Sequence, residues 1–297
     1  MANKIDFTVV IGVRDSNPNG DPQNNNRPRQ KTDGRGWISN VALTRKLRNR
    51  LFLTGNSILE MPVDQGGTEH NSLSKRVYEA STEMAKFIDE ENERKKGEKK
   101  PDTEAFLKRY GKALKENYLD CRLLGYLIAP KKNDKELTST NVNARGALTI
   151  TNAVSVKPVS ITDVQLTKSF SNDAERHGTD TMGMKYNVDY GVYVASGSIN
   201  PDVAEENGVT DSDIERVKQA LASMYYGDET ASRPAGSNAI LQVVWVEHQG
   251  SKYGVPDWKI AEGVKVVQGD TDKFSDVKVD YSALEQYDSL KVSTLIN

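Results

Sequence analysis

The chain has 297 residues, of which 36% are hydrophobic and 28% are charged, and its formal net charge is −2. This composition is typical of a globular protein with room for one large domain or two ordinary ones. No apolar run approaches the roughly 20 residues that a membrane helix needs, so we expect a cytoplasmic protein without a membrane partner. The one cysteine, Cys121, excludes an internal disulfide and lies in a mixed apolar run that predicts burial.

Charge is distributed unevenly along the chain. Residues 27–50 hold eight basic residues and one acid, Asp33, whereas residues 198–297 hold seventeen acids and nine bases. The basic residues at positions 45–50 lack the acidic partners four positions away that a solvated helix face usually carries. A segment of one sign therefore favours a surface for a polyanion, of which nucleic acid is the commonest.

The N-terminal part predicts a strand, a loop and a helix. Residues 5–13 alternate as a strand does, and residues 15–36 are rich in Pro, Asn and Gly. Ser39 is a suitable N-cap for a helix of about 39–53, with Ile38 and Leu43 placed as a hydrophobic staple. The inner stripe of this helix is formed by Leu43, Leu47 and Leu51.

Basic side chains occupy the rest of that helix. Arg45 and Arg48 point away from the leucine stripe, and Lys46 and Arg50 lie on its flank. We therefore expect the helix to bury its leucines and to offer its cations outward.

The remaining elements alternate between helices and strands. Residues 70–118 read as helical, interrupted by a charged, solvated run at 90–100. Strands are expected at about 119–129, 144–154, 188–194 and 240–247, the last followed by a β-rich tail. Residues 157–185 form a polar stretch too long for a simple hairpin connection. Thr210 and Asp213 cap a further helix, whose inner face is Ile214, Val217, Leu221 and Met224.

Two separated strand–helix units with strands between them predict an α+β fold. The arrangement suggests a ferredoxin-like antiparallel sheet, of the kind found in RNA-recognition motifs, with large helical insertions. We expect one domain over residues 1–297.

The loop after the first strand was weighed as a calcium site. Asp15, Asn17, Asn19 and Gly20 match the first positions of an EF-hand loop, but Asn26 stands where a bidentate glutamate is needed. We therefore interpret the loop as a turn that positions backbone amides and asparagine side chains.

No pattern in the sequence indicates catalysis, a metal site or a cofactor. The histidines lie far apart, at positions 70, 177 and 248, and no phosphate-binding loop or nucleophile elbow is present. Further cations at Arg145, Lys168 and Lys185 add to the basic helix. Single-stranded RNA is a suitable partner for a ferredoxin-like sheet.

Ordered motifs extend over nearly the whole chain. They are Asn17-Pro18-Asn19-Gly20-Asp21-Pro22, Arg27-Pro28-Arg29, Ser39 through Asn49, Asp120-Cys121-Arg122 with Gly125, Ala144-Arg145-Gly146, Ser155 to Pro158, Thr181 to Lys185, Tyr190 to Tyr193, and Ala231-Ser232-Arg233. In their order and spacing these motifs resemble the CRISPR-associated Cas-seven family, the backbone subunit of type I Cascade, most like the type I-C and I-B branch. The sequence departs from the family pattern at Leu124, Met184 and Pro234.

This resemblance implies a hand-shaped protein with fingers at approximately 60–115 and a thumb at 157–185. Copies would polymerise head-to-tail along one CRISPR RNA, beside other Cascade subunits, and leave guide bases open to pair with target DNA. The RNA-binding residues it implies are Asn17, Asn19, Gly20, Ser39, Arg45, Lys46, Arg48, Arg145, Lys168, Met182 and Lys185. Met182 would be a wedge between bases or, alternatively, ordinary core packing.

Three further hypotheses remain open at this point. Opposite charge at the two ends of the chain, with Asp211 and Asp213 among the acids, would help to order copies head-to-tail. A type III-like subunit that cleaves target RNA is the rival function, with Asp33 as its candidate residue. A generic RNA chaperone is the second rival.

Overall fold

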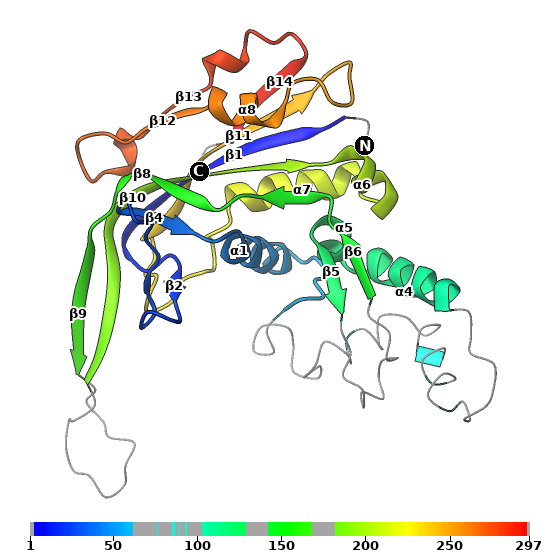
Figure 1. The fold of residues 1–297 in the computed structure, drawn as a ribbon, viewed down its shortest axis with the longest axis horizontal. Helices are drawn as coiled ribbons and strands as arrows, with labels where there is room; N and C mark the ends of the chain where they lie inside the picture. Colours follow the sequence, from blue (N-terminus) through cyan, green and yellow to red (C-terminus); the bar gives the residue numbers. More distant parts are fainter. Residues whose placement is uncertain are drawn as a thin grey trace, which may run out of the picture. The chain divides into compact units, whose positions relative to one another are not determined.

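The computed structural model describes residues 3–61, 76, 85, 86, 89, 93, 103–128, 142–167 and 182–295 (Figure 1). The chain divides into two compact units. The first comprises Met1–Ile5, Leu47–Thr149 and Ser198–Ala220, and the second comprises Asp6–Lys46, Ile150–Gly197 and Leu221–Asn297. Because helix α1 (Asn40–Leu53) crosses the division, its first half belongs to the second unit and its second half to the first.

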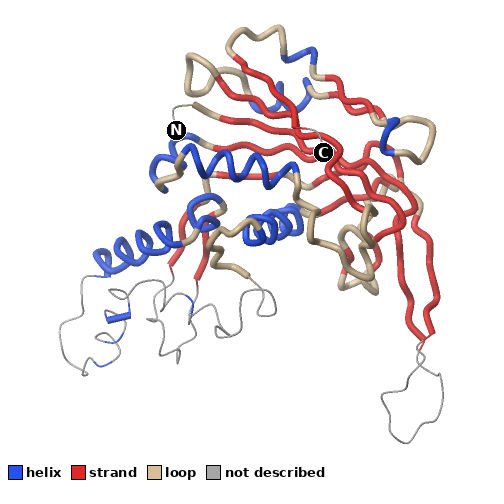
Figure 2. The backbone as a smooth tube through the Cα atoms, turned by 180° about the vertical axis from the view of Figure 1, so that it is seen from behind, coloured by secondary structure: helices blue, strands red, loops and turns tan. Residues whose placement is uncertain are grey.

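A mixed α+β architecture with a large antiparallel sheet is confirmed. The eight-stranded sheet in the described part of the chain has the order β14-β11-β1-β10-β8-β4, and β7 and β9 also pair with β10. Its strands, seen as neighbouring red tubes in Figure 2, are β1 (Ile5–Ser16), β4 (Arg35–Ile38), β7 (Leu148–Ile150), β8 (Ala153–Pro158), β9 (Ile161–Thr167), β10 (Met182–Ile199), β11 (Asn238–His248) and β14 (Leu290–Leu295).

The predicted strand at 5–13 is confirmed within β1, and both of its faces are buried. The apolar residues and the intervening Asp6 and Thr8 are all withdrawn from solvent. Phe7 stacks on Trp245 of β11 with ring centroids 5.8 Å apart. Asp6 is satisfied by buried His248, whose Nε2 lies 2.7 Å from Asp6 Oδ2. The Gly254 amide donates to His248 Nδ1, so Nε2 carries the proton and donates to Asp6.

A second layer of small elements covers part of the sheet in the second unit. These elements are α8 (Asp257–Gly263), β12 (Lys265–Val267), η1 (Phe274–Asp276), β13 (Lys278–Asp280) and η2 (Ser282–Leu284). Ile260 and Leu284 pack with Val244 and Val246 of β11, which explains why the tail of the chain stays folded on the sheet.

The stretch 157–185 contains strands of its own. β9 and the beginning of β10 pair antiparallel from Met182 opposite Thr167 to Val188 opposite Ile161. They extend as a two-stranded arm on the left of Figure 1. The sequence predicts only a polar insertion here, because the exposed strands have no continuous apolar face that would indicate them. Residues 168–181 of the expected thumb lie outside the described residues.

The first unit has its own core. It contains α4 (Thr103–Asn117), α5 (Leu119–Leu123), β5 (Gly125–Ile128), β6 (Val142–Arg145), α6 (Pro201–Asn207) and most of α7 (Asp211–Ala222). Tyr110 and Leu114 of α4 pack with Cys121, Tyr126 and the strand β6. Cys121 is buried as predicted, and burial raises the pKa of its thiol. Most of the expected fingers, residues 62–102, lie outside the described residues apart from five positions.

The strand predicted at 119–129 is wrong for its first half. Residues 119–123 form helix α5, and the strand begins only at Gly125, whose φ of 73° turns the chain. A short apolar run is compatible with either a buried helix or a strand. Here the Asp120 carboxylate favours the helix, because from its place in α5 it accepts hydrogen bonds from the backbone amides of Leu59 and Glu60.

The two predicted caps are confirmed. Ser39 Oγ accepts the Ala42 amide at the start of α1, and Leu43, Leu47 and Leu51 are buried. In α7 the Thr210 hydroxyl accepts the Asp213 amide, while the Asp213 carboxylate accepts the Thr210 amide. No helix among the described residues is long and apolar enough to cross a membrane.

Candidate nucleic-acid interface

The loop after β1 is held by the side chains that the sequence singles out. Asn17 is buried, and its Nδ2 donates to the carbonyl of Asn26 at 2.7 Å. Asn19 Oδ1 accepts the Ser39 amide at 2.9 Å, which fixes the loop to the start of α1. A Cβ at Gly20 would lie 2.0 Å from Asn26 Oδ1, so only glycine fits there. These residues shape the loop from within.

Two short strands complete this loop. β2 (Gly20–Asp21) pairs antiparallel with β3 (Arg27–Pro28). Arg27 reaches from β3 to the arm, where its Nη1 lies 2.8 Å from Asp163 Oδ1 and its guanidinium stacks over the Tyr186 ring at 5.1 Å. Arg27 therefore joins the loop to the base of the β9–β10 arm.

Lys46 forms an ion pair with Asp228 inside the second unit. Its side chain is only 12% exposed, and its Nζ donates to Asp228 Oδ1. The other carboxylate oxygen of Asp228 accepts Arg233 Nε at 3.0 Å. Burial lowers the pKa of Lys46, and the bond to Asp228 opposes that shift. The Asp228 carboxylate thus pairs with both Lys46 and Arg233, each of which belongs to one of the motifs.

Three sequence-predicted site residues converge on one segment, residues 228–233. Besides Lys46 at Asp228, Lys185 Nζ donates to the carbonyl of Ala231 at 2.9 Å. The backbone N–H of Asn17 donates to the backbone carbonyl of Ser232 at 3.0 Å. The loop after β1, helix α1 and strand β10 are therefore joined at this segment, which we call the 228–233 segment.

Arg48 does not point outward, and the expectation that α1 offers all its cations to solvent is wrong. Its Nε lies 3.2 Å from Asp120 Oδ2 and its Nη2 lies 2.9 Å from Glu60 Oε2, within the first unit. A buried guanidinium needs such partners, because removing a charge from water is costly. Arg45 is half-buried on the same helix.

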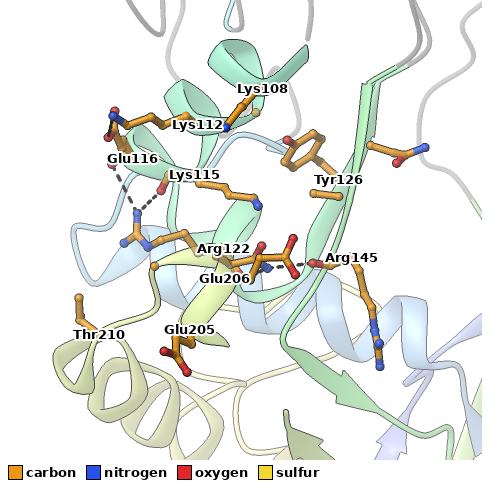
Figure 3. Close-up of a pocket in the computed structure, with 15 residues that line it drawn as sticks. Lys108, Lys112, Lys115, Glu116, Arg122, Tyr126, Arg145, Glu205, Glu206 and Thr210 are labelled. Atoms are coloured by element: carbon orange, nitrogen blue, oxygen red, sulfur yellow. Dashed lines mark hydrogen bonds and ion pairs between the residues drawn. The ribbon is translucent and has the colours of Figure 1, made fainter. Parts of the chain in front are cut away.

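Arg145 is exposed beside a large cavity in the first unit. The cavity has a volume of about 930 Å³ and is lined from α4, α5, β5, β6, α6 and Thr210 (Figure 3). Asn207 also lines the cavity, and its Nδ2 donates to the backbone carbonyls of Arg122 and Arg145. Figure 3 shows the Arg145 guanidinium pointing away from Lys108 and Lys112 on α4.

The cavity wall carries both signs of charge. Arg122 is neutralised by Asp213, with Nε and Nη2 on its two carboxylate oxygens, and Lys112 pairs with Glu116. Lys115 reaches toward the space, opposite Tyr126, whose pKa burial raises to about 12. Glu205 and Glu206 also line the cavity, so its charge does not favour a polyanion as clearly as the basic segment does.

The chain was compared with known proteins. Residues 3–282 match the family model of CRISPR-associated protein Cas7. The chain belongs to the Cas7 family. A CRISPR-associated protein Cas7 of Haloferax volcanii is 25% identical over 266 residues, which cover 85% of this chain and 73% of that protein.

A solved structure resembles this Cas7 chain in fold. A chain of a CRISPR RNA-guided surveillance complex in a pre-nicking state has a TM-score of 0.51 and 14% identity, covering 86% of this chain and 80% of its own. A chain of another CRISPR RNA-guided surveillance complex has a TM-score of 0.47 and 15% identity, covering 88% and 74%.

Some predicted site residues are not placed by the structure. Lys168 lies outside the described residues, and Met182 is described only as the first residue of β10, opposite Thr167.

Asp33 is exposed and pairs with Arg35, whose Nε lies 2.7 Å from Asp33 Oδ2. The Arg35 amide and guanidinium lower the pKa of Asp33. Among the described residues, no group of three or more His, Cys, Asp or Glu side chains could hold a metal ion.

Sequence reasoning missed the acids that organise this site. Asp120 and Asp228 each form an ion pair with a basic side chain of α1, although neither is among the residues that the sequence predicts for the site. A signal for Asp120 was present, because it stands inside the Asp120-Cys121-Arg122 motif. Asp228 lies just before Ala231-Ser232-Arg233, so its proximity to a motif was the available indication.

Proposed function

We propose that this Cas7 protein is the CRISPR RNA-binding backbone subunit of a type I Cascade, most like the type I-C and I-B branch. Copies bind head-to-tail along the guide, contact its sugar–phosphate backbone, and present bases to target DNA beside the other Cascade subunits. The observation that carries the proposal is the convergence of Asn17, Lys46 and Lys185 on the 228–233 segment in a chain of the Cas7 family. The protein acts in the prokaryotic cytoplasm.

The exposure of each cation suggests which of them contact the guide. Lys46 and Arg48 are engaged internally and set the shape of the site. Lys31 and Arg35, from the same basic segment, are more exposed and are suited to meet phosphates together with Arg45. A protein that accepts any guide needs contacts of this kind, because phosphates carry no sequence information.

The arm gives the proposed thumb. Its described strands carry apolar side chains in the open, with Val164, Leu166 and Met184 exposed. Met182, the first residue of β10, would enter between bases as an apolar wedge. The core sheet corresponds to a modified RNA-recognition motif, with fingers at approximately 60–115.

Charge order between copies is the remaining part of the proposal. The acidic C-terminal third of one copy would face the basic segment of the next, a heterologous contact that generates an open helix. Asp213 does not serve this role, because it is buried under Arg122. Asp211 is exposed, so Asp211→Lys is the charge reversal that probes filament length.

Salt dependence tests the guide contacts. Binding of two unrelated single-stranded RNAs should weaken with salt with the same slope, at roughly −0.7 per neutralised phosphate. Lys31→Ala with Arg35→Ala should flatten that slope by roughly 1 to 1.5 for both RNAs. Loss confined to one sequence would instead indicate base readout and contradict the proposal.

We propose further that the protein is not an enzyme. The rival, cleavage of target RNA as in type III complexes, predicts periodic cuts in complementary RNA when the assembled complex is given a divalent metal. Cuts that disappear in Asp33→Ala would establish the rival. The existing Asp33–Arg35 pair favours a structural role for this carboxylate.

A further inference from the structure

Two cations share the carboxylate of Asp228 in the second unit. Lys46 Nζ donates to Asp228 Oδ1, and Arg233 Nε lies 3.0 Å from Asp228 Oδ2. The side chains of Lys46, Asp228 and Arg233 are 12%, 11% and 23% exposed, so all three charges are largely withdrawn from water. Because one carboxylate carries a single negative charge, this partly buried cluster keeps an uncompensated positive charge.

The uncompensated charge acts on the cations themselves. Burial lowers the pKa of Lys46, and the positive charge of Arg233 adds to that effect, whereas the bond to Asp228 opposes it. Lys185 brings a third cation to the same segment, against one further acid, the exposed Glu229. An anion bound at this cluster would relieve the repulsion between its cations, so the cluster is suited to an anionic group.

The Arg233 guanidinium has donors left for such a group. Its Nε is taken by Asp228, but neither Nη atom has a hydrogen-bond partner among the described residues. Neither Nη atom is buried. Because the donors of a guanidinium lie in one plane as a rigid fork, anchoring Nε leaves the two Nη atoms to bind oxygens of a single phosphate.

The backbone around Arg233 is fixed before any ligand arrives. Thr230 and Arg233 exchange backbone hydrogen bonds of 2.9 and 3.0 Å, and the backbone N–H of Asp228 donates to the carbonyl of Tyr225 at 3.2 Å. Arg233 therefore combines a tight turn in the backbone with a side chain that Asp228 holds. This arrangement reduces the entropy that would be lost when the side chain is ordered on a ligand.

We propose that the Arg233 guanidinium binds one phosphate of the bound RNA strand and that Asp228 is the positioning residue that orients it, an inference that rests on the proposed function. The phosphate contacts both Nη atoms and neutralises the charge that Asp228 leaves uncompensated. RNA is the favoured source of the phosphate, because Asn17, Lys46 and Lys185 contact the same segment. Such a contact is the same for every guide, since phosphates carry no sequence information.

The test measures binding of the full-length protein to two unrelated, unstructured, fluorescein-labelled single-stranded RNAs at several KCl concentrations. Arg233→Gln should weaken binding of both RNAs equally, by at least about fivefold, and flatten the salt slope by roughly 0.7, the value for one phosphate. This variant keeps the Lys46–Asp228 pair, so its unfolding midpoint should change little. Lys291→Gln is the matched control, because it removes a cation of the same unit that pairs with Glu247.

Two further variants separate orientation from charge. Arg233→Lys keeps the charge and can still pair with Asp228, but it lacks the fork, so it should preserve the salt slope and bind more weakly than the unsubstituted protein. Asp228→Asn removes a negative charge, which by itself would strengthen RNA binding. Under conditions where the variant is folded, weaker binding is expected if Asp228 orients Arg233, and stronger binding would contradict that role. Glu229→Gln is the control for the charge effect alone.

The outcomes separate this inference from the function on which it rests. If the unsubstituted protein binds both RNAs but Arg233→Gln keeps the affinity and slope of Lys291→Gln, the inference is wrong. A loss confined to one sequence would also overturn it. If the unsubstituted protein binds neither RNA, the proposed function fails.

Inorganic phosphate at matched ionic strength distinguishes a free anion from the RNA backbone. If it raises the unfolding midpoint through Arg233 while Arg233→Gln leaves RNA binding unchanged, the cluster binds a free anion and the inference is overturned.

Discussion

Arg48 and Asp120 form a buried ion pair, with side chains 10% and 1% exposed and Nε 3.2 Å from Oδ2. The carboxylate also accepts the amides of Leu59 and Glu60, so one acid joins α1, α5 and the segment after α1 in the first unit. A cation from the motif that predicts RNA binding therefore has a structural partner 72 residues away in sequence.

Replacing either partner should destabilise the protein strongly. Arg48→Ala leaves Asp120 buried without its cation, and breaking a buried pair in this way costs about 3–5 kcal/mol. Lys112→Ala is the control, because its pair with Glu116 is exposed on both sides and contributes about 0.5 kcal/mol or less. Urea unfolding measures both. An Arg48→Ala variant as stable as Lys112→Ala, with weaker RNA binding, would instead make Arg48 a direct contact.

Asp228 should couple energetically to Lys46. A double-mutant cycle with Lys46→Met and Asp228→Asn should give an interaction energy of about 1–3 kcal/mol, because the two groups share one largely buried contact. The same cycle on the exposed Asp33 and Arg35 pair should give a much smaller interaction energy, because solvent screens that pair. Additive effects at Lys46 and Asp228 would show that the 228–233 segment is held by other contacts.

Acid should weaken the first unit through Asp213. Burial opposes ionisation of this carboxyl, but hydrogen bonds from Arg122 and Thr210 prevail and lower its pKa below 3.8. The unfolded chain then binds more protons, so the stability that Asp213 contributes is present above about pH 4 and is lost as the pH falls through the lowered pKa. Unfolding free energies measured from pH 6 downward should fall more steeply for the unsubstituted protein than for Asp213→Asn. Parallel profiles would exclude this contribution.

Gly20→Ala should deform the loop after β1. The added Cβ would lie 2.0 Å from Asn26 Oδ1 and 2.8 Å from the Asn26 carbonyl oxygen, so the loop must move. Gly183→Ala is a control for folding alone, because nothing lies within 4 Å of a Cβ there. Since Gly183 lies in the proposed thumb, the RNA affinity of Gly20→Ala is compared with that of the unsubstituted protein. We expect Gly20→Ala to lower RNA affinity at least several-fold under conditions where both variants remain folded. Equal affinities would remove the loop from the interface.

Local patterns in the sequence predicted the elements that depend on neighbouring residues. The leucine stripe of α1, the Ser39 cap and the reciprocal Thr210–Asp213 cap are all confirmed. Each involves residues within one or two helical turns, where spacing alone determines which side chains meet.

The environment of the cations could not be predicted in the same way. A helical wheel places Arg48 away from the leucines and Lys46 on their flank, but it contains no information on what packs there. Their acids lie 182 and 72 residues away in sequence, and only the fold brings them together. The resemblance singled out Asn17, Lys46 and Lys185, and the structure shows that each of them contacts the 228–233 segment.

The stoichiometry of the protein on RNA tests the central claim most directly. The full-length protein should be mixed with guide RNAs of increasing length in two unrelated sequences, and the mass of each complex measured by native mass spectrometry. A backbone subunit predicts that the number of bound copies rises in constant steps with RNA length and is the same for both sequences. A single copy at every length, or binding to one sequence alone, would contradict the account.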